Sequence, residues 1–151
     1  MARASLLDIV NELAAVVTDV LDDQTDYAIQ VRPRRVISAV TTPLIDIYPG
    51  DASRFPQSGG FRLLTDQGGY QLTVRARISG DVDAQQDLLL MFMDDASPLS
   101  LAAAVTDDPS LNGLASDVSA QDPTGHVVYE EGDAGSLLGF QFTCVVLPAE
   151  S

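Results

Sequence analysis

The segment from residue 70 to residue 78 alternates apolar and polar side chains without interruption, and it constrains the fold more than any other part of the chain. Its apolar positions are Tyr70, Leu72, Val74, Ala76 and Ile78, and its polar positions are Gln71, Thr73, Arg75 and Arg77. A period of two predicts a β-strand with one buried face. We expect the other face, with Arg75 and Arg77, to be wet or interfacial.

The rest of the chain predicts helices and strands around this strand. A period of 3.6 from Ser5 to Asp22 predicts an amphipathic helix that begins at a Ser5/Asp8 capping box. Further helices are expected from a cap at Asp81 or Asp83 to about Met93, and at 99–105, with Pro98 in the first turn of the latter. Strands are expected at 27–31, 36–40, 44–48, 114–120, 125–131 and 137–147.

This order of elements predicts an α+β fold. We expect an N-terminal helix and a mixed or antiparallel sheet with the helices packed on one face. The length suits a single domain over residues 1–151, with an extended hairpin or loop at about 50–69, where Pro56, Gly59 and Gly60 lie. In the last strand, one face is expected to be apolar: Leu138, Phe140, Phe142, Cys144 and Val146.

The composition excludes much chemistry. The chain has no lysine, one histidine and one cysteine, so amine nucleophiles, lysine phosphate loops and multi-histidine metal sites are excluded. His126 is expected at a surface turn and Cys144 as a small buried hydrophobe. The acids from Asp81 to Asp87 do not fit a calcium loop. We therefore expect no catalytic residues, no cofactor and no metal, and no run of residues is long and apolar enough to span a membrane.

The charge is unevenly distributed along the chain. Residues 1–78 hold nine acids and all eight arginines, whereas residues 79–151 hold thirteen acids and no base. Sequence-specific binding of DNA is improbable for such a chain. We expect a subunit interface in which the acidic face of one copy meets the arginines of the next: Arg32, Arg34, Arg35, Arg54, Arg75 and Arg77. The alternative is that each arginine pairs with acids of its own subunit.

Two stretches resemble one protein family. The first is TPLIDIYP at 42–49, which follows the helix and precedes a glycine-rich hairpin that leads into the alternating strand. The second is DPSLNGLASDV at 108–118, which is followed by the terminal strand. Together they resemble the small tail terminator and neck proteins of long-tailed bacteriophages. The resemblance spans nearly the whole chain through short structural motifs.

The resemblance implies a virion protein assembled in the host cytoplasm, without enzymatic activity. Six copies would form a ring on the head-proximal end of the tail tube, ending its polymerisation and joining it to the head-side connector. DNA would pass through the lumen. The alternatives are a head-tail stopper or adaptor, a tube-like subunit, or, from another class, a small cytoplasmic ligand-binding or immunity-type domain with an apolar pocket.

Overall fold

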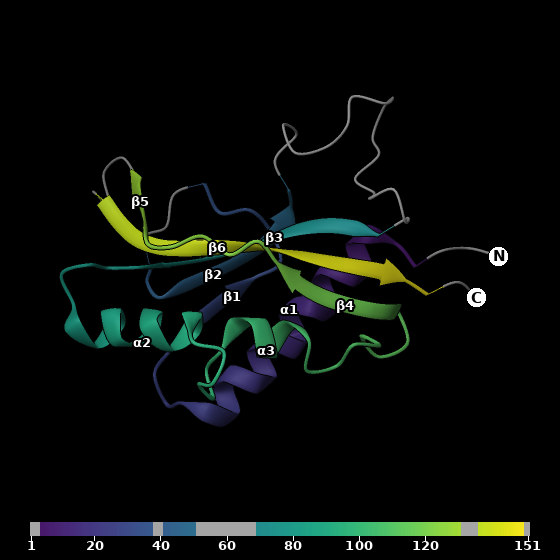
Figure 1. The fold of residues 1–151 in the computed structure, drawn as a ribbon, viewed down its shortest axis with the longest axis horizontal. Helices are drawn as coiled ribbons and strands as arrows, with labels where there is room; N and C mark the ends of the chain where they lie inside the picture. The colour runs from purple at the N-terminus through teal and green to yellow at the C-terminus, as the bar shows by residue number, and fades with distance from the viewer. Residues whose placement is uncertain (1–3, 38–40, 51–68, 131–135, 150–151) are drawn as a thin grey trace.

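The structure, a computed structural model, describes residues 4–37, 41–50, 69–130 and 136–149. It is a mixed α+β fold with the N-terminal helix first, as predicted (Figure 1). The elements in chain order are α1 Leu6–Gln24, β1 Gln30–Arg32, β2 Leu44–Pro49, β3 Tyr70–Ile78, α2 Asp83–Met93, α3 Leu101–Val105, β4 Ala115–Gln121, β5 Val127–Glu130 and β6 Ser136–Pro148.

The strands form one mixed sheet in the order β1-β2-β3-β6-β4. Among the strands of the described residues, β1 and β2 run parallel and the other pairs are antiparallel. The long strand β6 pairs along one side with the whole of β3. On its other side, β5 pairs with the first residues of β6 and β4 pairs with the last ones. The strands β1 and β4 therefore lie at opposite edges of the sheet.

The N-terminal helix forms where the period of 3.6 predicts it. The Ser5 hydroxyl accepts a hydrogen bond from the amide of Asp8 at 3.1 Å, which caps the first turn. The helix then continues two residues beyond the predicted end, to Gln24. Its apolar stripe is buried: Ile9, Val10, Leu13, Ala14, Val17 and Leu21.

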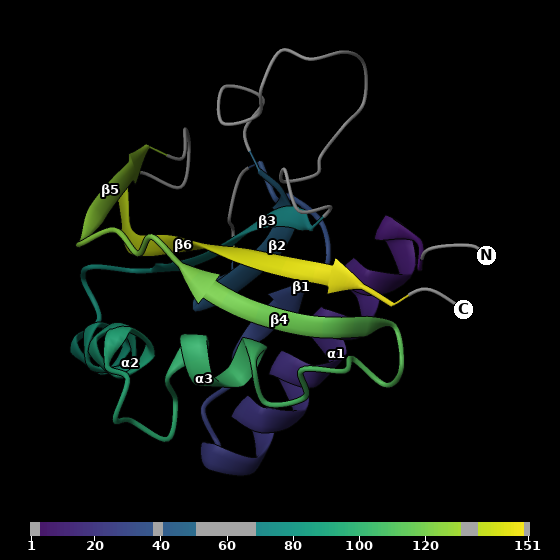
Figure 2. The same ribbon diagram turned by 45° about the vertical axis from the view of Figure 1, so that its right-hand side comes forward.

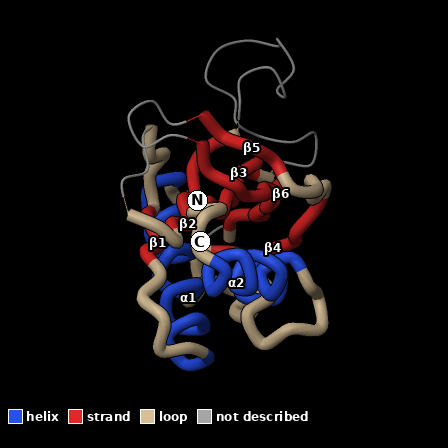
Figure 3. Tube along the Cα trace, turned by 90° about the vertical axis from the view of Figure 1, so that its left-hand side faces the viewer, coloured by secondary structure: helices blue, strands red, loops and turns tan. Residues whose placement is uncertain are grey.

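The three helices cover one face of the sheet. Figures 1 and 2 show them on the same side of the strands, and Figure 3 shows the helical and strand layers from the end. The helices pack on the apolar sides of the two longest strands, which confirms both predicted period-2 patterns. The buried strand residues on this side include Leu72, Val74, Ala76, Ile78, Phe140, Phe142, Cys144 and Val146.

Three local predictions differ from the structure. The residue that precedes α2 is Val82, which makes no side-chain cap hydrogen bond, so neither Asp81 nor Asp83 caps the helix. Asp83 instead lies in the first turn, where a negative charge suits the helix dipole. The short helix α3 begins at Leu101, and Ser100 caps it by accepting from the amide of Ala103 at 3.2 Å. Residues 36 and 37 are not in a strand, and 38–40 lie outside the described residues, as do residues 51–68 of the expected hairpin or loop at about 50–69.

Candidate functional site

A buried ion cluster lies on the face of the sheet opposite the helices. Asp46 in β2 is directly opposite Arg75 in β3, so the two side chains share a face. Arg75 donates to Asp46 through Nε to Oδ1 at 3.1 Å and through Nη2 to Oδ2 at 2.6 Å, and Nη2 of Arg77 reaches Oδ2 at 3.1 Å. Asp46 and Arg77 are fully buried and Arg75 is 8% exposed. Two guanidinium groups thus share one carboxylate away from water.

The backbone of Val36 closes over this cluster. Its N–H donates to Oδ2 of Asp46 at 3.0 Å. Its carbonyl oxygen accepts from Nη2 of Arg75 at 3.0 Å and from Nη2 of Arg77 at 2.8 Å. The half-buried Val36 side chain packs against Leu44 and Leu137. The segment that follows β1 is therefore fixed on this face of the sheet at one residue, by three polar groups and an apolar contact.

Aromatic rings flank the cluster. The guanidinium of Arg75 lies 5.2 Å from the ring centroid of Tyr48 and 5.5 Å from that of Tyr129. Burial opposes the charge on Arg75, but the hydrogen bond and charge of Asp46 outweigh it, so the pKa of Arg75 lies above its ordinary value. Burial raises the pKa of the Tyr129 hydroxyl, which donates to Oε1 of Gln141 at 2.9 Å, to about 12. Both groups therefore keep one protonation state near neutral pH.

The expectation that Arg75 and Arg77 lie on a wet or interfacial face is wrong. Val36 covers them and Asp46 supplies their counter-charge, so both bind within their own subunit. This is the alternative that the sequence left open, and it holds for these two arginines. Sequence reasoning missed Asp46 as their partner. The signal was a carboxylate in the middle of the apolar run from Leu44 to Tyr48, where an unpaired charge would be costly.

The other arginines of the predicted interface are placed differently. Arg32, Arg34 and Arg35 are exposed at the end of β1 and in the segment after it. Nη1 of Arg34 donates to Oδ1 of Asn11 in α1 at 3.0 Å, and the guanidinium of Arg35 lies 4.9 Å from the Tyr48 ring centroid. Arg54 lies outside the described residues. Among the residues that the structure describes, every exposed arginine belongs to the stretch 32–35, which we call the arginine segment.

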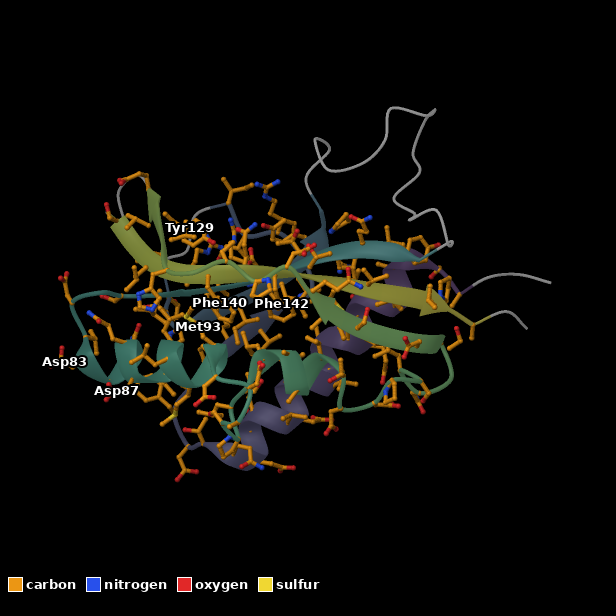
Figure 4. All side chains as sticks on the ribbon, viewed as in Figure 1. Asp83, Asp87, Met93, Tyr129, Phe140 and Phe142 are labelled. Carbon is orange, nitrogen blue, oxygen red and sulfur yellow. The ribbon has the colours of Figure 1, made fainter. Side chains whose placement is uncertain are left out.

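The acids of the second half lie at the opposite edge of the sheet and on the helices. Asp117 in β4 and Asp122 just after it are exposed. Asp83 and Asp87 on α2 point away from the sheet (Figure 4). Asp94, Asp95 and Asp107, which flank α2 and α3, are exposed as well. No base occurs from residue 79 onward, so this surface is uniformly acidic.

A groove of about 670 Å³ opens between the helices and the edge of the sheet. Its deeply buried lining residues are the apolar Phe92, Val118, Phe140 and Phe142 and the polar Ser100, whose hydroxyl caps α3. Met93 lies close to Phe140 and Phe142 between α2 and β6, whereas Tyr129 is on the other side of β6 (Figure 4). Asp95, Ala103 and Gln121 line the more exposed part. The groove combines an apolar interior with an acidic surrounding, and its volume is typical of ligand pockets.

The histidine and the cysteine do not form a reactive site. His126 is exposed. Cys144 is fully buried, and burial raises the pKa of its thiol to about 12, which disfavours the thiolate. Within the described ranges, no three His, Cys, Asp or Glu side chains come together as metal ligands.

The stretch 108–118 of the family resemblance forms a tight loop over residues 108–114 and then enters β4 at Ala115. The carboxylate of Asp108 accepts from the amides of Ser110 at 3.1 Å and Asn112 at 2.9 Å and from the Ser110 hydroxyl at 2.7 Å. These hydrogen bonds hold the pKa of Asp108 below its ordinary value, and the bond from the Ser110 hydroxyl has the largest effect. Three consecutive residues have positive φ: Leu111, Asn112 and Gly113. The motif thus has a structural role in this chain.

Comparison with protein-family models and with curated proteins found no match to this chain. Of the helices described, none has the length and apolar character needed to cross a membrane.

Proposed function

We propose that the chain is a structural protein that assembles head to tail into a homo-hexameric ring of the phage tail-terminator type. The observation that carries this proposal is the separation of charge in the fold. The arginine segment adjoins β1 at one edge of the sheet, and exposed Asp117 and Asp122 lie at the β4 edge. One copy therefore presents its exposed arginines at one edge of the sheet and exposed acids at the other, and α1 beside β1 carries the exposed acids Asp19, Asp22 and Asp23.

This separation favours a heterologous contact. If two copies met through the same patch, arginines would face arginines or carboxylates would face carboxylates, and like charges repel. If the arginine segment of one copy meets the β4 edge of the next, opposite charges face each other. Each copy then keeps one surface of each sign for a further copy, so the contact repeats, and it closes into a ring when the rotation between successive copies completes a full turn.

The net charge suits a ring through which DNA passes. Each chain carries a formal charge of −14, so six copies carry about −84 before counterions bind. An acidic wall repels phosphate and lets the duplex slide, whereas a basic wall would hold it. The partners proposed on the family resemblance are the tail tube protein and the head-side connector or stopper, in a virion without catalysis by this chain.

The groove favours a second candidate, a small ligand-binding domain. Its 670 Å³ volume and aromatic lining would suit an apolar small molecule. Such a domain would work as a monomer or dimer. A monomer or dimer that binds a small ligand does not explain the separation of charge, and we therefore prefer the ring.

Sedimentation velocity of the purified chain, alone and with tail tubes, tests the proposal. The ring predicts association that weakens with added salt, since exposed charges are screened. Arg34→Glu is expected to lower the associated fraction strongly. Gln24→Glu adds a negative charge at the exposed last residue of α1, thirteen residues along the helix from the Asn11 that binds Arg34, and is the matched control. A chain that stays monomeric at every salt concentration and never sediments with tubes would refute the ring.

A further inference from the structure

Ile37 is the most exposed large apolar side chain among the described residues, at 81%. It directly follows the arginine segment and Val36. Single exposed hydrophobic residues are common on protein surfaces and need no explanation by themselves. Ile37 differs because the residue before it is held on both sides of its backbone by the buried ion cluster.

The contacts of Val36 fix the backbone directly before Ile37. The N–H and the carbonyl oxygen of Val36 bind Asp46, Arg75 and Arg77, and its side chain packs on Leu44 and Leu137. The backbone on the N-terminal side of Ile37 is thus ordered before any contact with a second copy forms, and pre-organisation of this kind increases affinity. The ion cluster thus has a second consequence besides stability: it presents an apolar side chain next to positive charges.

The groove has the complementary chemistry. Its inner wall is apolar and aromatic, Asp95 lines its mouth, and α2, α3, β4 and their connections carry acids and no base. The groove lies on the helix side of the sheet, near the β4 edge, whereas Val36 covers the opposite side, over β2 and β3. A copy therefore cannot fill its own groove with its own Ile37.

We propose that Ile37 of one copy inserts into the groove of a second copy. Arg34 and Arg35 then face the acids around Asp95, and the apolar side chain meets Phe92, Phe140 and Phe142. The proposal rests on the head-to-tail association of the proposed function and identifies the residues that make the contact. The groove is large enough for Ile37 together with part of the backbone that carries it.

Cysteine cross-linking tests this contact directly. The native Cys144 is fully buried and its thiol has a raised pKa, so it provides an unreactive background. Ile37→Cys places a thiol at the position of the inserted side chain, and Ala103→Cys places one at an exposed position that lines the groove. Under mild oxidation, the double variant is expected to give a ladder of covalent multimers of the 16.0 kDa chain. Each single variant should stay uncross-linked, and a double variant no more cross-linked than the singles would overturn the proposal.

A second experiment separates this inference from the ring itself. Ile37→Ser is expected to reduce the associated species to monomer, whereas Leu7→Ser, which changes a 57% exposed leucine of α1, should keep the wild-type mass. If Ile37→Ser assembles like the wild type, the insertion is wrong and the ring stands. If the wild type never associates, the proposed function falls as well. A small apolar molecule that native mass spectrometry finds bound equally in wild type and Ile37→Ser would also overturn the insertion.

Discussion

Replacing Asp46 by asparagine is expected to destabilise the protein severely. The substitution keeps the size of the side chain but removes its charge, which leaves two buried guanidinium groups without a counter-ion. It also turns one of the two acceptor oxygens into an NH₂ donor. The amide would then point donors at Arg75, Arg77 or the Val36 N–H, all of which are donors themselves.

The magnitude follows from the contacts. Asp46 accepts four hydrogen bonds, three of them from guanidinium groups, at 2.6 to 3.1 Å. Removing one partner of a buried ion pair costs about 3 to 5 kcal/mol, since the remaining charge stays buried and uncompensated. At 2 to 4 °C per kcal/mol for a chain of this size, the melting temperature should fall by about 6 to 20 °C.

Thermal unfolding followed by circular dichroism is the assay. Asp117→Asn is the matched control, because it makes the same chemical change at an exposed position of β4 and should stay within about 0.5 kcal/mol of the wild type. If Asp46→Asn melts within the same margin as this control, the carboxylate of Asp46 does not stabilise the fold, and the stabilising role of the ion cluster is refuted.

Replacing the whole cluster by apolar residues separates stability from assembly. Asp46→Leu, Arg75→Met and Arg77→Met together remove all three charges, and such replacements are often neutral or stabilising. The triple variant should therefore recover much of the stability that Asp46→Asn loses. It also releases the backbone of Val36, so we expect a folded chain with weakened association. A triple variant that assembles like the wild type would refute the positioning of Ile37 by the cluster.

Three further substitutions or labels test the fold. Phe140→Ala should cost about 3 to 5 kcal/mol in urea unfolding, since the ring is 97% buried beside Phe142; an unchanged midpoint would show that the register of β6 is wrong. Gly139→Ala should cost roughly 1 to 3 kcal/mol or more, because its Cβ would clash with the carbonyl oxygen of Ala76, whereas Gly80→Ala, with open space around it, should not. The Cys144 thiol should react with a thiol reagent at pH 8 only after unfolding, and rapid labelling of the native chain would show that it is exposed.

The elements that local patterns specify could be predicted from the sequence. The helix α1 has a capping residue and a continuous apolar stripe, the strand β3 has an unbroken period of two, and β6 has an apolar residue at every second position from Leu138 to Val146. In each case the pattern also identifies the buried face. The short α3 begins two residues later than the sequence predicts, because Ser100 caps it, and Pro98 therefore lies before the helix and not in its first turn.

The burial of the arginines could not be predicted in this way. Alternation puts Arg75 and Arg77 on one face but does not say what covers that face. Their cover is the backbone of Val36, 39 and 41 residues away in the chain, and backbone groups leave no signature in the sequence. The groove is likewise formed by elements that meet only in the folded chain. Composition did predict that residues 79–151 offer a purely acidic surface, because burial cannot add bases that the sequence lacks.

The most direct test of the central claim is to add the purified chain to growing tail tubes and measure tube lengths and tube ends by electron microscopy. A terminator ring predicts density of six copies, about 96 kDa from a chain of 16.0 kDa, at one end of each tube and tubes that stop growing. Tubes that grow to the same lengths with bare ends, whatever the concentration of the chain, would contradict it.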